Sequence, residues 1–171
     1  MTEEREKIEI RLFDPLEWRF YKAIRLKALQ TDPGVFGSNH LKESARADDE
    51  WKSALSDSGL GVFGVFHYGD IIGMTGIYVD KDDSTRAGLW GSWLEPKWRG
   101  KGISEVMYKA RIEWARQHPE VTCIRVSHRK SNTASKMANR KHGFEFTHEG
   151  ERTWPDGVTE AEVFYELKVK D

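Results

Sequence analysis

The sequence predicts an α/β protein with a mixed, mostly antiparallel central sheet of about seven strands and about four helices. Short segments that alternate apolar and polar residues, or that are rich in β-branched residues, recur along the chain. Longer segments with apolar residues at helical spacing lie between them. Glycine, proline and aspartate mark most of the boundaries. The order that results is β-α-α-β-β-β-α-β-α-β-β.

The N-terminal part begins with a strand and continues into a helix. Residues 8–13 alternate apolar and polar side chains, which is typical of a strand. Asp14 is suited to cap the following helix, with Pro15 at its first position. The residues DPG at 32–34 end this helix. Its inward face is predicted from residues that repeat at helical spacing, namely Phe20, Ile24 and Ala28.

A second helix is expected over residues 41–57, with Trp51 and Leu55 facing inward. A hairpin with its turn at Gly69 and Asp70 follows it. The remaining predicted elements are strands at 62–68, 71–79, 86–94, 122–128, 144–152 and 163–169, and helices at 103–118 and 132–142. The second of these helices ends at Gly143, which favours a glycine C-cap. The helix from residue 103 has its predicted inward face at Ile103, Val106, Met107, Ala110 and Trp114.

Composition excludes several classes of protein. The 171 residues carry 27 basic and 28 acidic side chains, a net charge of -1 that argues against a general nucleic-acid binder. The six histidines lack metal-ligand spacing, so we expect no metal site. No segment approaches the roughly 20 apolar residues of a membrane helix. Residues 1–7 are charged and do not resemble a signal peptide.

A single cysteine, Cys123, lies in an apolar run and is expected to be a buried structural thiol. One cysteine permits no disulfide within the chain, which suits a reducing compartment. We therefore expect a cytoplasmic protein without nucleic-acid or membrane partners.

The segment LEPKWRGKGIS at residues 94–104 joins a predicted strand to a predicted helix. The first turn of a helix has unpaired N–H groups, and glycine lets a ligand approach the backbone closely. This combination favours a phosphate or pyrophosphate, and Arg99 and Lys101 add positive charge. The P-loop pattern does not fit, and Glu105 stands where the dinucleotide fingerprint needs a third glycine. A solvated glycine turn before an ordinary helix is the simpler alternative.

Two motifs resemble those of the GCN5-related N-acetyltransferase (GNAT) family. The pattern Arg-x-x-Gly-x-Gly/Ala matches Arg99, Gly102 and Ser104, with serine at the last position. The segment NTASKMANRKHGF at residues 132–144 resembles the family's Asn-x-x-Ala … Tyr-x-x-x-Gly-Phe helix. The order of elements is also that of the family. The resemblance implies that residues 1–171 are a single acetyltransferase domain.

The resemblance implies acetyl-CoA as acyl donor. Backbone amides of the loop hold the pyrophosphate in the family, and the pantetheine arm lies in a gap where two strands diverge. Asn132 is expected to contact this arm, or simply to cap its helix. The cofactor-binding residues implied here are Trp93, Leu94, Arg99, Gly100, Lys101, Gly102, Ile103, Ser104, Asn132 and Ser135.

The implied reaction is direct attack of a primary amine on the thioester. The N–H of Leu94 is expected to stabilise the oxyanion. The family's tyrosine acid corresponds to Asn139, which has no proton to give. Water, or another residue such as Tyr165, stays open as the acid, and slow turnover is the third alternative. A glutamate that acts as base in some members corresponds to Ser127. The alternatives for the base are His128, Glu43 and Glu162.

The substrate side is implied to include the first two helices and the last hairpin. Glu43 follows a Phe-Gly-Ser segment and is the preferred residue for recognising a cationic amine of a small molecule or peptide. Further implied residues are Phe36, Asn39, His40, Trp51, Trp154 and Glu160. A binding protein that senses acyl-CoA without catalysis is the alternative function. The resemblance also allows a homodimer.

Overall fold

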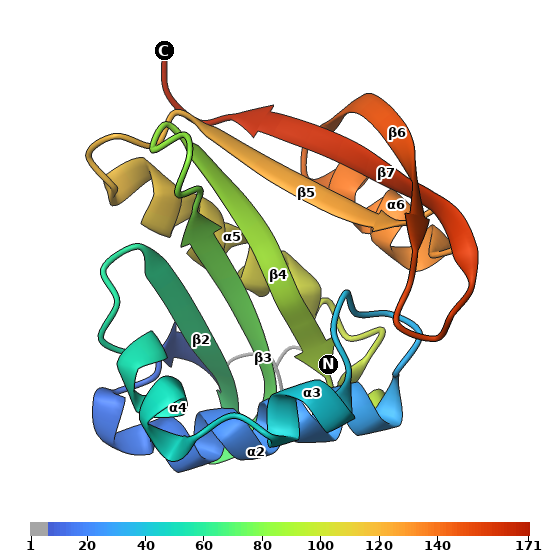
Figure 1. Cartoon of the computed structure of the whole chain (residues 1–171). Helices are drawn as coiled ribbons and strands as arrows, with labels where there is room; N and C mark the ends of the chain where they lie inside the picture. The colour runs from blue at the N-terminus through green and yellow to red at the C-terminus, as the bar shows by residue number, and fades with distance from the viewer. Residues whose placement is uncertain (1–6) are drawn as a thin grey trace.

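A computed structural model describes residues 7–171 (Figure 1). In this part of the chain the strands are β1 (Ile8–Leu12), β2 (Leu60–His67), β3 (Asp70–Val79), β4 (Arg86–Leu94), β5 (Cys123–Arg129), β6 (Glu145–Thr153) and β7 (Thr159–Lys168). The α-helices are α2 (Trp18–Thr31), α3 (His40–Ser44), α4 (Asp48–Ala54), α5 (Ile103–Gln117) and α6 (Thr133–Lys141). Two 3₁₀ turns are η1 (Pro15–Glu17) and η2 (Pro96–Trp98). The predicted α/β class is confirmed.

The strands form one seven-stranded sheet in the order β1-β2-β3-β4-β5-β7-β6. Neighbouring strands are antiparallel except for β4 and β5, which are parallel. These two strands pair only over residues 86–88 and 123–125, and they diverge beyond that point (Figure 1). The divergence that the family resemblance implies is therefore present beside the second half of β4.

Each face of the sheet carries its own apolar core, because successive side chains of a strand point to opposite faces. On β2, Val62 and Phe66 pack with α2 and with the fully buried Trp51 of α4. Phe63 and Val65, on the opposite face of the same strand, pack in the cores that include α5. The sheet is thus covered by α2 and α4 on one face and by α5 on the other.

The first helical segment begins at Asp14, as predicted. The carboxylate of Asp14 accepts the N–H of Leu16 at 2.8 Å, and the side chain of Glu17 accepts the N–H of Asp14 at 2.8 Å. This reciprocal cap satisfies N–H groups that would otherwise lack partners at the helix start.

Two residues predicted to face inward are exposed instead. Phe20 on α2 and Val106 on α5 are 56% and 40% accessible. The buried faces consist of Trp18, Tyr21, Ile24, Arg25, Ala28 and Leu29 on α2, and of Ile103, Met107, Tyr108, Arg111 and Ala115 on α5. Both faces include an arginine, so apolar periodicity alone does not identify them.

The helix predicted over residues 41–57 is two helices, α3 and α4, which raises the number of helices above the expected four. The acidic residues Asp48, Asp49 and Glu50 form the first turn of α4. The side chain of Glu50 accepts the N–H of Ala47 at 2.9 Å, and acidic residues are favoured at a helix N-terminus. A new helix start is therefore more favourable here than a continuous helix.

Three smaller predictions need correction. The β2–β3 turn is at Tyr68 and Gly69, which both have positive φ values of 50° and 84°, so Asp70 already belongs to β3. Gly61 lies inside β2 rather than ahead of it. Cys123 is partly exposed at the start of β5 and is not fully buried.

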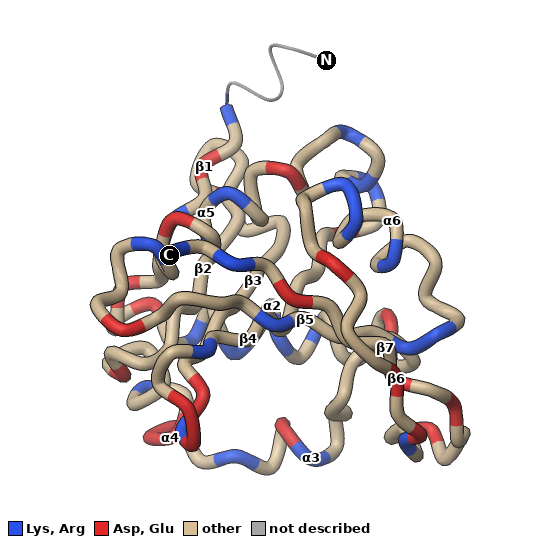
Figure 2. The backbone as a smooth tube through the Cα atoms, turned by 90° about the horizontal axis from the view of Figure 1, so that it is seen from above, with Lys and Arg blue, Asp and Glu red and all other residues tan. Residues whose placement is uncertain are grey.

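No helix among the described residues is long and apolar enough to cross a membrane. The prediction for the N-terminal segment concerns residues that lie, except for Lys7, outside the described part. Basic and acidic residues are both distributed over the whole backbone (Figure 2), in line with the small net charge.

Candidate active site

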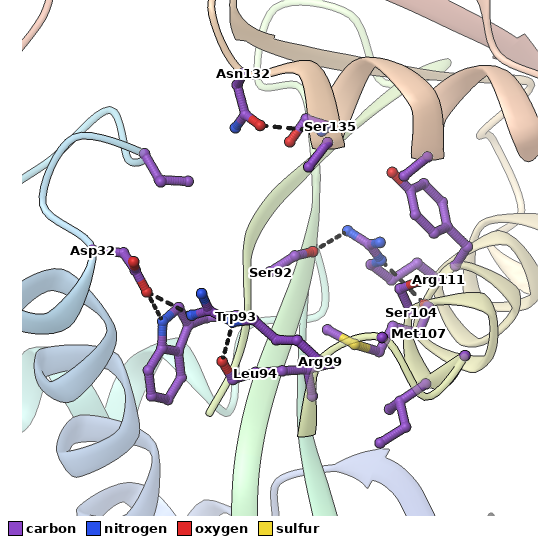
Figure 3. Close-up of a pocket in the computed structure, with 17 residues that line it drawn as sticks. Asp32, Ser92, Trp93, Leu94, Arg99, Ser104, Met107, Arg111, Asn132 and Ser135 are labelled. Carbon is purple, nitrogen blue, oxygen red and sulfur yellow. Dashed lines mark hydrogen bonds and ion pairs between the residues drawn. The ribbon is translucent and has the colours of Figure 1, made fainter. Parts of the chain in front are cut away.

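A first cavity of about 390 Å³ opens where β4 ends, between the N-termini of α5 and α6 (Figure 3). Of the residues predicted to bind the cofactor, it is lined by Trp93, Leu94, Arg99, Gly100, Gly102, Ile103, Ser104, Asn132 and Ser135. Lys101 does not line it, and its ammonium group lies 5.7 Å from the centre of the Trp98 ring. The two motifs, about 30 residues apart in sequence, therefore meet at one cavity.

The glycine loop has a backbone that favours glycine. Gly100 and Gly102 have φ values of 74° and 78°, a left-handed region that is strained for other residues. Gly102 is the N-cap of α5, and the first helical turn, whose N–H groups donate no bond to carbonyl groups of the helix itself, begins at Ile103. Ser104 follows in that turn and lines the cavity. The predicted anion site is therefore built from a helix N-terminus that faces a cavity.

At the end of β4, the N–H of Leu94 points away from β3. The N–H of the next residue, Glu95, donates to the carbonyl oxygen of Ile72 on β3 at 2.9 Å. Successive backbone groups of a strand point to opposite sides, so the N–H of Leu94 faces the side where β5 has diverged. Arg99 Nε donates to the carbonyl oxygen of Leu94 at 3.0 Å, which holds this strand end in place.

Asp32 at the end of α2 connects this helix to the cavity, a role that the sequence did not reveal. Its Oδ2 accepts hydrogen bonds from Trp93 Nε1 at 2.7 Å and from Arg99 Nη2 at 2.6 Å (Figure 3). Partial burial opposes ionisation, but the bonds from Trp93 and Arg99 outweigh it and lower the pKa of Asp32. The Arg99 side chain therefore already has a carboxylate partner, and the anion site depends mainly on backbone N–H groups.

Asn132 and Ser135 occupy the start of α6, on the opposite wall of the cavity. Asn132 Oδ1 accepts the N–H of Ser135 at 3.1 Å, so Asn132 is an N-cap, which was one of its two predicted roles. The amide nitrogen of Asn132 is left over from this bond, and the residue lines the cavity. The cap and a contact with a ligand are compatible.

A second cavity of about 450 Å³ continues from the first. The two share a boundary lined by Val35, Ser92, Tyr108, Arg111, Asn132 and Ser135. Beyond this boundary the second cavity is lined mainly by side chains of α2, the loop at 36–38, β4, β5, β7 and the β6–β7 hairpin. A ligand held along β4 in the first cavity would therefore reach molecules in the second.

Asn139 stands at this second cavity but is 1% exposed. The hydroxyl of Tyr108 on α5 donates to Asn139 Oδ1 at 2.5 Å, and Asn139 Nδ2 has no partner. Burial raises the pKa of the Tyr108 phenol. A phenol is therefore present at the boundary of the two cavities, although α6 does not supply it.

Ser127 and Glu162 lie together in the second cavity. Ser127 Oγ donates to Glu162 Oε1 at 2.7 Å, and Arg152 Nη1 donates to the same oxygen at 3.0 Å. Glu162 Oε2 has no such partner among the described residues. Glu162 is also the single carboxylate that lines this cavity in the described part of the chain.

His128 also lines the second cavity, but both of its ring nitrogens have partners. Nδ1 lies 2.6 Å from the carbonyl oxygen of Arg129, which can only accept, so Nδ1 carries the proton. Nε2 then accepts from the hydroxyl of Tyr165 at 3.3 Å. Tyr165 is 2% exposed and belongs to the core, so neither residue presents a free group to the cavity.

Glu43 lines neither cavity and is 7% exposed. Its two carboxylate oxygens accept from Arg25 Nε at 3.1 Å and Arg25 Nη2 at 2.8 Å, and Arg46 lies 3.6 Å away. This geometry gives no support to amine recognition by Glu43, because both oxygens already hold a buried guanidinium. Glu43 thus holds Arg25, which lines the second cavity, and amine recognition by Glu43 stays a prediction.

The other residues expected on the substrate side separate into two groups. Phe36 and Trp154 line the second cavity. The others line neither cavity. Asn39 caps α3 and His40 is its first residue, while Trp51 lies in the core. The carboxylate of Glu160 accepts from Arg129 and from the N–H of Ser131.

Tyr108 and Arg111 were missed, although the sequence carried a signal for them. They fall on the buried face of α5 between Met107 and Ala115, and polar residues on an apolar face call for an explanation. Arg111 is 2% exposed and lines both cavities. Burial lowers its pKa to about 10, so it remains charged at neutral pH.

No cluster of three or more metal-ligating side chains occurs among residues 7–171. The chemistry available at the two cavities consists of backbone N–H groups, the phenols of Tyr78 and Tyr108, the carboxylates of Asp32 and Glu162, and guanidinium groups. These groups suit anion binding, stabilisation of an oxyanion and proton transfer.

Comparisons with known proteins agree with this arrangement. The sequence model of the Acetyltransferase (GNAT) family matches residues 23–144. Similar solved structures include an acetyltransferase of the GNAT family from Streptococcus pneumoniae, with 18% identity, a TM-score of 0.81 and coverage of 94% of this chain and 98% of that chain.

Another similar structure is yncA from Salmonella typhimurium, solved with its cofactor acetyl-CoA, with 17% identity, a TM-score of 0.78 and coverage of 96% and 95%. A ribosomal-protein-alanine N-acetyltransferase from Brucella melitensis has 18% identity, a TM-score of 0.77 and coverage of 94% and 99%. No curated protein sequence matches the chain. At these identities the structures show a common fold.

Proposed function

This chain belongs to the GNAT acetyltransferase family, and we propose that it transfers the acetyl group of acetyl-CoA to a primary amine by direct attack. The whole chain would act as one acetyltransferase domain. The observation that carries the proposal is the junction of the two cavities. A helix N-terminus suited to a pyrophosphate opens onto the end of β4, and a second cavity, lined by both diverging strands, adjoins the first.

Acetyl-CoA would occupy the first cavity. Backbone N–H groups from Gly100 to Ser104 would bind the pyrophosphate, and the arm would follow β4 past Trp93 and Leu94 toward Ser92. Asn132 and Ser135 would flank the arm from α6. The support for this placement is that all of these residues except Lys101 line the same cavity.

The thioester would lie beside Leu94. An N–H group aimed into a gap between strands is suited to stabilise the oxyanion that forms when the amine attacks. Glu162 is our proposed base, because it is the carboxylate of the second cavity and Ser127 and Arg152 fix its position. It would accept the proton of the attacking amine, directly or through a water molecule.

Tyr108 is our proposed proton donor to the departing thiolate. The usual tyrosine of the family is absent at Asn139, and the hydroxyl of Tyr108 donates to the side chain that replaces it. In the reaction the hydroxyl would turn its proton from Asn139 Oδ1 to the thiolate, and the phenolate would recover a proton from water. A raised phenol pKa keeps the proton in place at neutral pH. Asn139 would then be a positioning residue, which holds the phenol at the boundary of the cavities.

The alternative function is an acyl-CoA sensor without catalysis. It would be favoured if side chains filled the space where the amine has to bind. The second cavity is open at about 450 Å³ and contains both an acid and a base candidate, which supports the enzyme. The test is thiol release from acetyl-CoA over a panel of amines, amino acids, polyamines, aminoglycosides and peptides, with calorimetric titration of acetyl-CoA alone. Binding with turnover supports the proposal, binding without turnover favours the sensor, and no binding contradicts both.

A further inference from the structure

The second cavity contains an excess of positive charge inside a nearly neutral protein. The charged side chains that line it are Arg25, Arg111, Arg125, Arg152 and Glu162. Basic and acidic residues are interspersed along the backbone (Figure 2) and the net charge of the chain is -1, so neither indicates this excess.

Three of these four arginines have carboxylate partners. Arg25 pairs with Glu43 at 2.8 Å, Arg125 pairs with Glu166 at 3.3 Å, and Arg152 pairs with Glu162 at 3.0 Å. No carboxylate in the described part of the chain forms an ion pair with Arg111. The cavity wall therefore carries one uncompensated positive charge, on Arg111.

Arg111 is held in place by neutral groups alone. Its Nη1 donates to Ser92 Oγ at 2.9 Å, and Nε donates to the carbonyl oxygen of Met107 at 3.2 Å (Figure 3). Ser92 Oγ in turn lies 2.7 Å from the hydroxyl of the fully buried Thr75. A buried guanidinium without a counterion is costly, and a bound anion that supplies the missing negative charge would remove this cost.

A second guanidinium has an unused donor in the same cavity. Arg25 is 6% exposed, and its Nη1 is buried without a hydrogen-bond partner, although Glu43 accepts from its Nε and Nη2. The Arg25 guanidinium lies 5.0 Å from the Phe36 ring and 5.4 Å from the Trp90 ring, both of which line the cavity. Its unused N–H is therefore fixed beside the cavity and provides a second donor for an anion.

We propose that Arg111, assisted by Arg25, binds a carboxylate group of the acyl acceptor, so that the acceptor is an amine that also carries a carboxylate. This inference rests on the proposed acetyl transfer. The acceptor rather than the acyl donor is the source of the carboxylate, because Arg25 lines the second cavity and not the first. A single charge is expected, since one carboxylate balances the one uncompensated arginine and a phosphate dianion would exceed it. The fork of donors on a guanidinium also matches the geometry of a carboxylate.

A carboxylate-binding site at Arg111 differs from the sequence-based prediction that Glu43 recognises a cationic amine. An amine that carries a carboxylate has little net charge, and the aromatic residues Phe36, Trp90 and Trp154 provide room for an apolar or flat side chain beside the anion. Amino acids and their derivatives are the substrate class that fits these features.

The experiment compares kcat/KM for carboxylate-bearing amines and for their amides, with acetyl-CoA as donor. The pairs are L-phenylalanine, L-methionine, L-glutamate and 4-aminobutanoate, each beside its carboxamide. We expect the best acid to exceed its amide by roughly 10- to 100-fold, the range of hydrogen bonds to charged groups. Amides that equal or exceed every acid would overturn the proposal without affecting the proposed acetyl transfer.

The variant Arg111→Met tests the residue itself, with Arg116→Gln as matched control. Arg116 lies on the same helix, is exposed and lines neither cavity. We expect Arg111→Met to lower kcat/KM for the acid at least about tenfold more than for its amide, and Arg111→Lys to restore part of the preference for the acid. Equal losses on acid and amide would assign Arg111 a structural role only and contradict the proposal.

Two further arms separate other sources of the anion. Succinyl-CoA replaces acetyl-CoA, and 2-aminoethyl phosphate is compared with 3-aminopropanoate. A preference for succinyl-CoA that depends on Arg111 would mean that Arg111 binds a carboxylate of the acyl donor. A preference for 2-aminoethyl phosphate would mean that the bound anion is a phosphate. Either result overturns the assignment.

A binding measurement tests the carboxylate site even if none of the amines is acetylated. N-acetyl-L-methionine and its amide are titrated calorimetrically into the wild-type chain in the presence of CoA. Binding of the acid at least tenfold tighter than the amide, lost in Arg111→Met, supports the carboxylate site even where no amine is acetylated. Equal affinity for both compounds contradicts it.

Discussion

The two cavities of this protein are built by different means, although they meet at the same boundary. The first is formed mainly by backbone, namely the positive-φ glycines of the loop, the N-terminus of α5 and the end of β4. The second is formed mainly by side chains from distant parts of the chain, held by ion pairs such as Arg25 with Glu43 and Arg152 with Glu162.

The difference has a chemical reason. Every enzyme that uses acetyl-CoA binds the same pyrophosphate. Backbone N–H groups can bind it whatever side chains most residues of the loop carry. An acceptor differs between enzymes and has to be recognised by particular side chains. We therefore expect changes in the first cavity to affect acetyl-CoA affinity, and changes in the second to affect turnover and the choice of amine.

The largest effect is expected in the second cavity, for Glu162→Gln. Removal of the proposed base should lower kcat by roughly 10²–10⁴-fold, the usual range for general acid–base catalysis. The calorimetric affinity for acetyl-CoA should be unchanged, because Glu162 does not line the first cavity. Glu166→Gln is the control, since Glu166 lies on the same strand and lines neither cavity. A kcat within threefold of wild type would exclude Glu162 as the base.

Glu43→Gln should affect the fold rather than recognition. It leaves the buried Arg25 guanidinium without its carboxylate, which we expect to cost about 3–5 kcal/mol in the free energy of unfolding. Urea denaturation measures this value. Asp49→Asn is the control, because the Asp49 side chain is exposed and its contact with Lys52 is 3.8 Å long, so its loss should be within about 0.5 kcal/mol. Normal stability with a raised KM for amines would restore the recognition role of Glu43.

In the first cavity, Ser104→Glu should weaken acetyl-CoA binding by roughly 10- to 100-fold, through repulsion between the new carboxylate and the phosphates. The fold should be preserved, because an acidic residue in the first turn of α5 favours the helix dipole. Ser104→Ala is the matched control and should bind acetyl-CoA as well as wild type. Equal affinity of the two variants would mean that the pyrophosphate lies elsewhere.

Several features of the two cavities could be predicted from sequence, and the reasons are local. Gly102, Asn132 and the strand before the loop lie in short segments whose conformation is set by neighbouring residues. The roles of Glu43 and Asn139 could not be predicted, because each depends on a partner far away in sequence, Arg25 and Tyr108 respectively.

Apolar periodicity was misleading for the same reason. It counted Phe20 and Val106 as inward and passed over buried arginines on both helices. A charged side chain is buried where other elements supply its hydrogen bonds, and Ser92 does this for Arg111. Whether an arginine on a helix is buried therefore depends on the tertiary structure and not on the sequence of that helix.

The smallest effect is expected at the boundary of the cavities, for Tyr108→Phe. We expect a loss of about tenfold in kcat, at or below the low end of general-acid contributions, because a thiolate is already a good leaving group. Steady-state kinetics with saturating acetyl-CoA measures it. Tyr68→Phe, in the exposed β2–β3 turn, is the control. An unchanged kcat in Tyr108→Phe would leave water as the proton donor.

The most direct measurement is a crystal structure of the chain with CoA. The central claim is that the first cavity holds the donor and delivers its sulfur to the boundary with the second. The account predicts pyrophosphate oxygens at hydrogen-bond distance from the backbone N–H groups of residues 100–104, with the sulfur between β4 and β5, beside Leu94 and Tyr108. A pyrophosphate bound elsewhere, or an arm that lies outside the diverging strands, would contradict it.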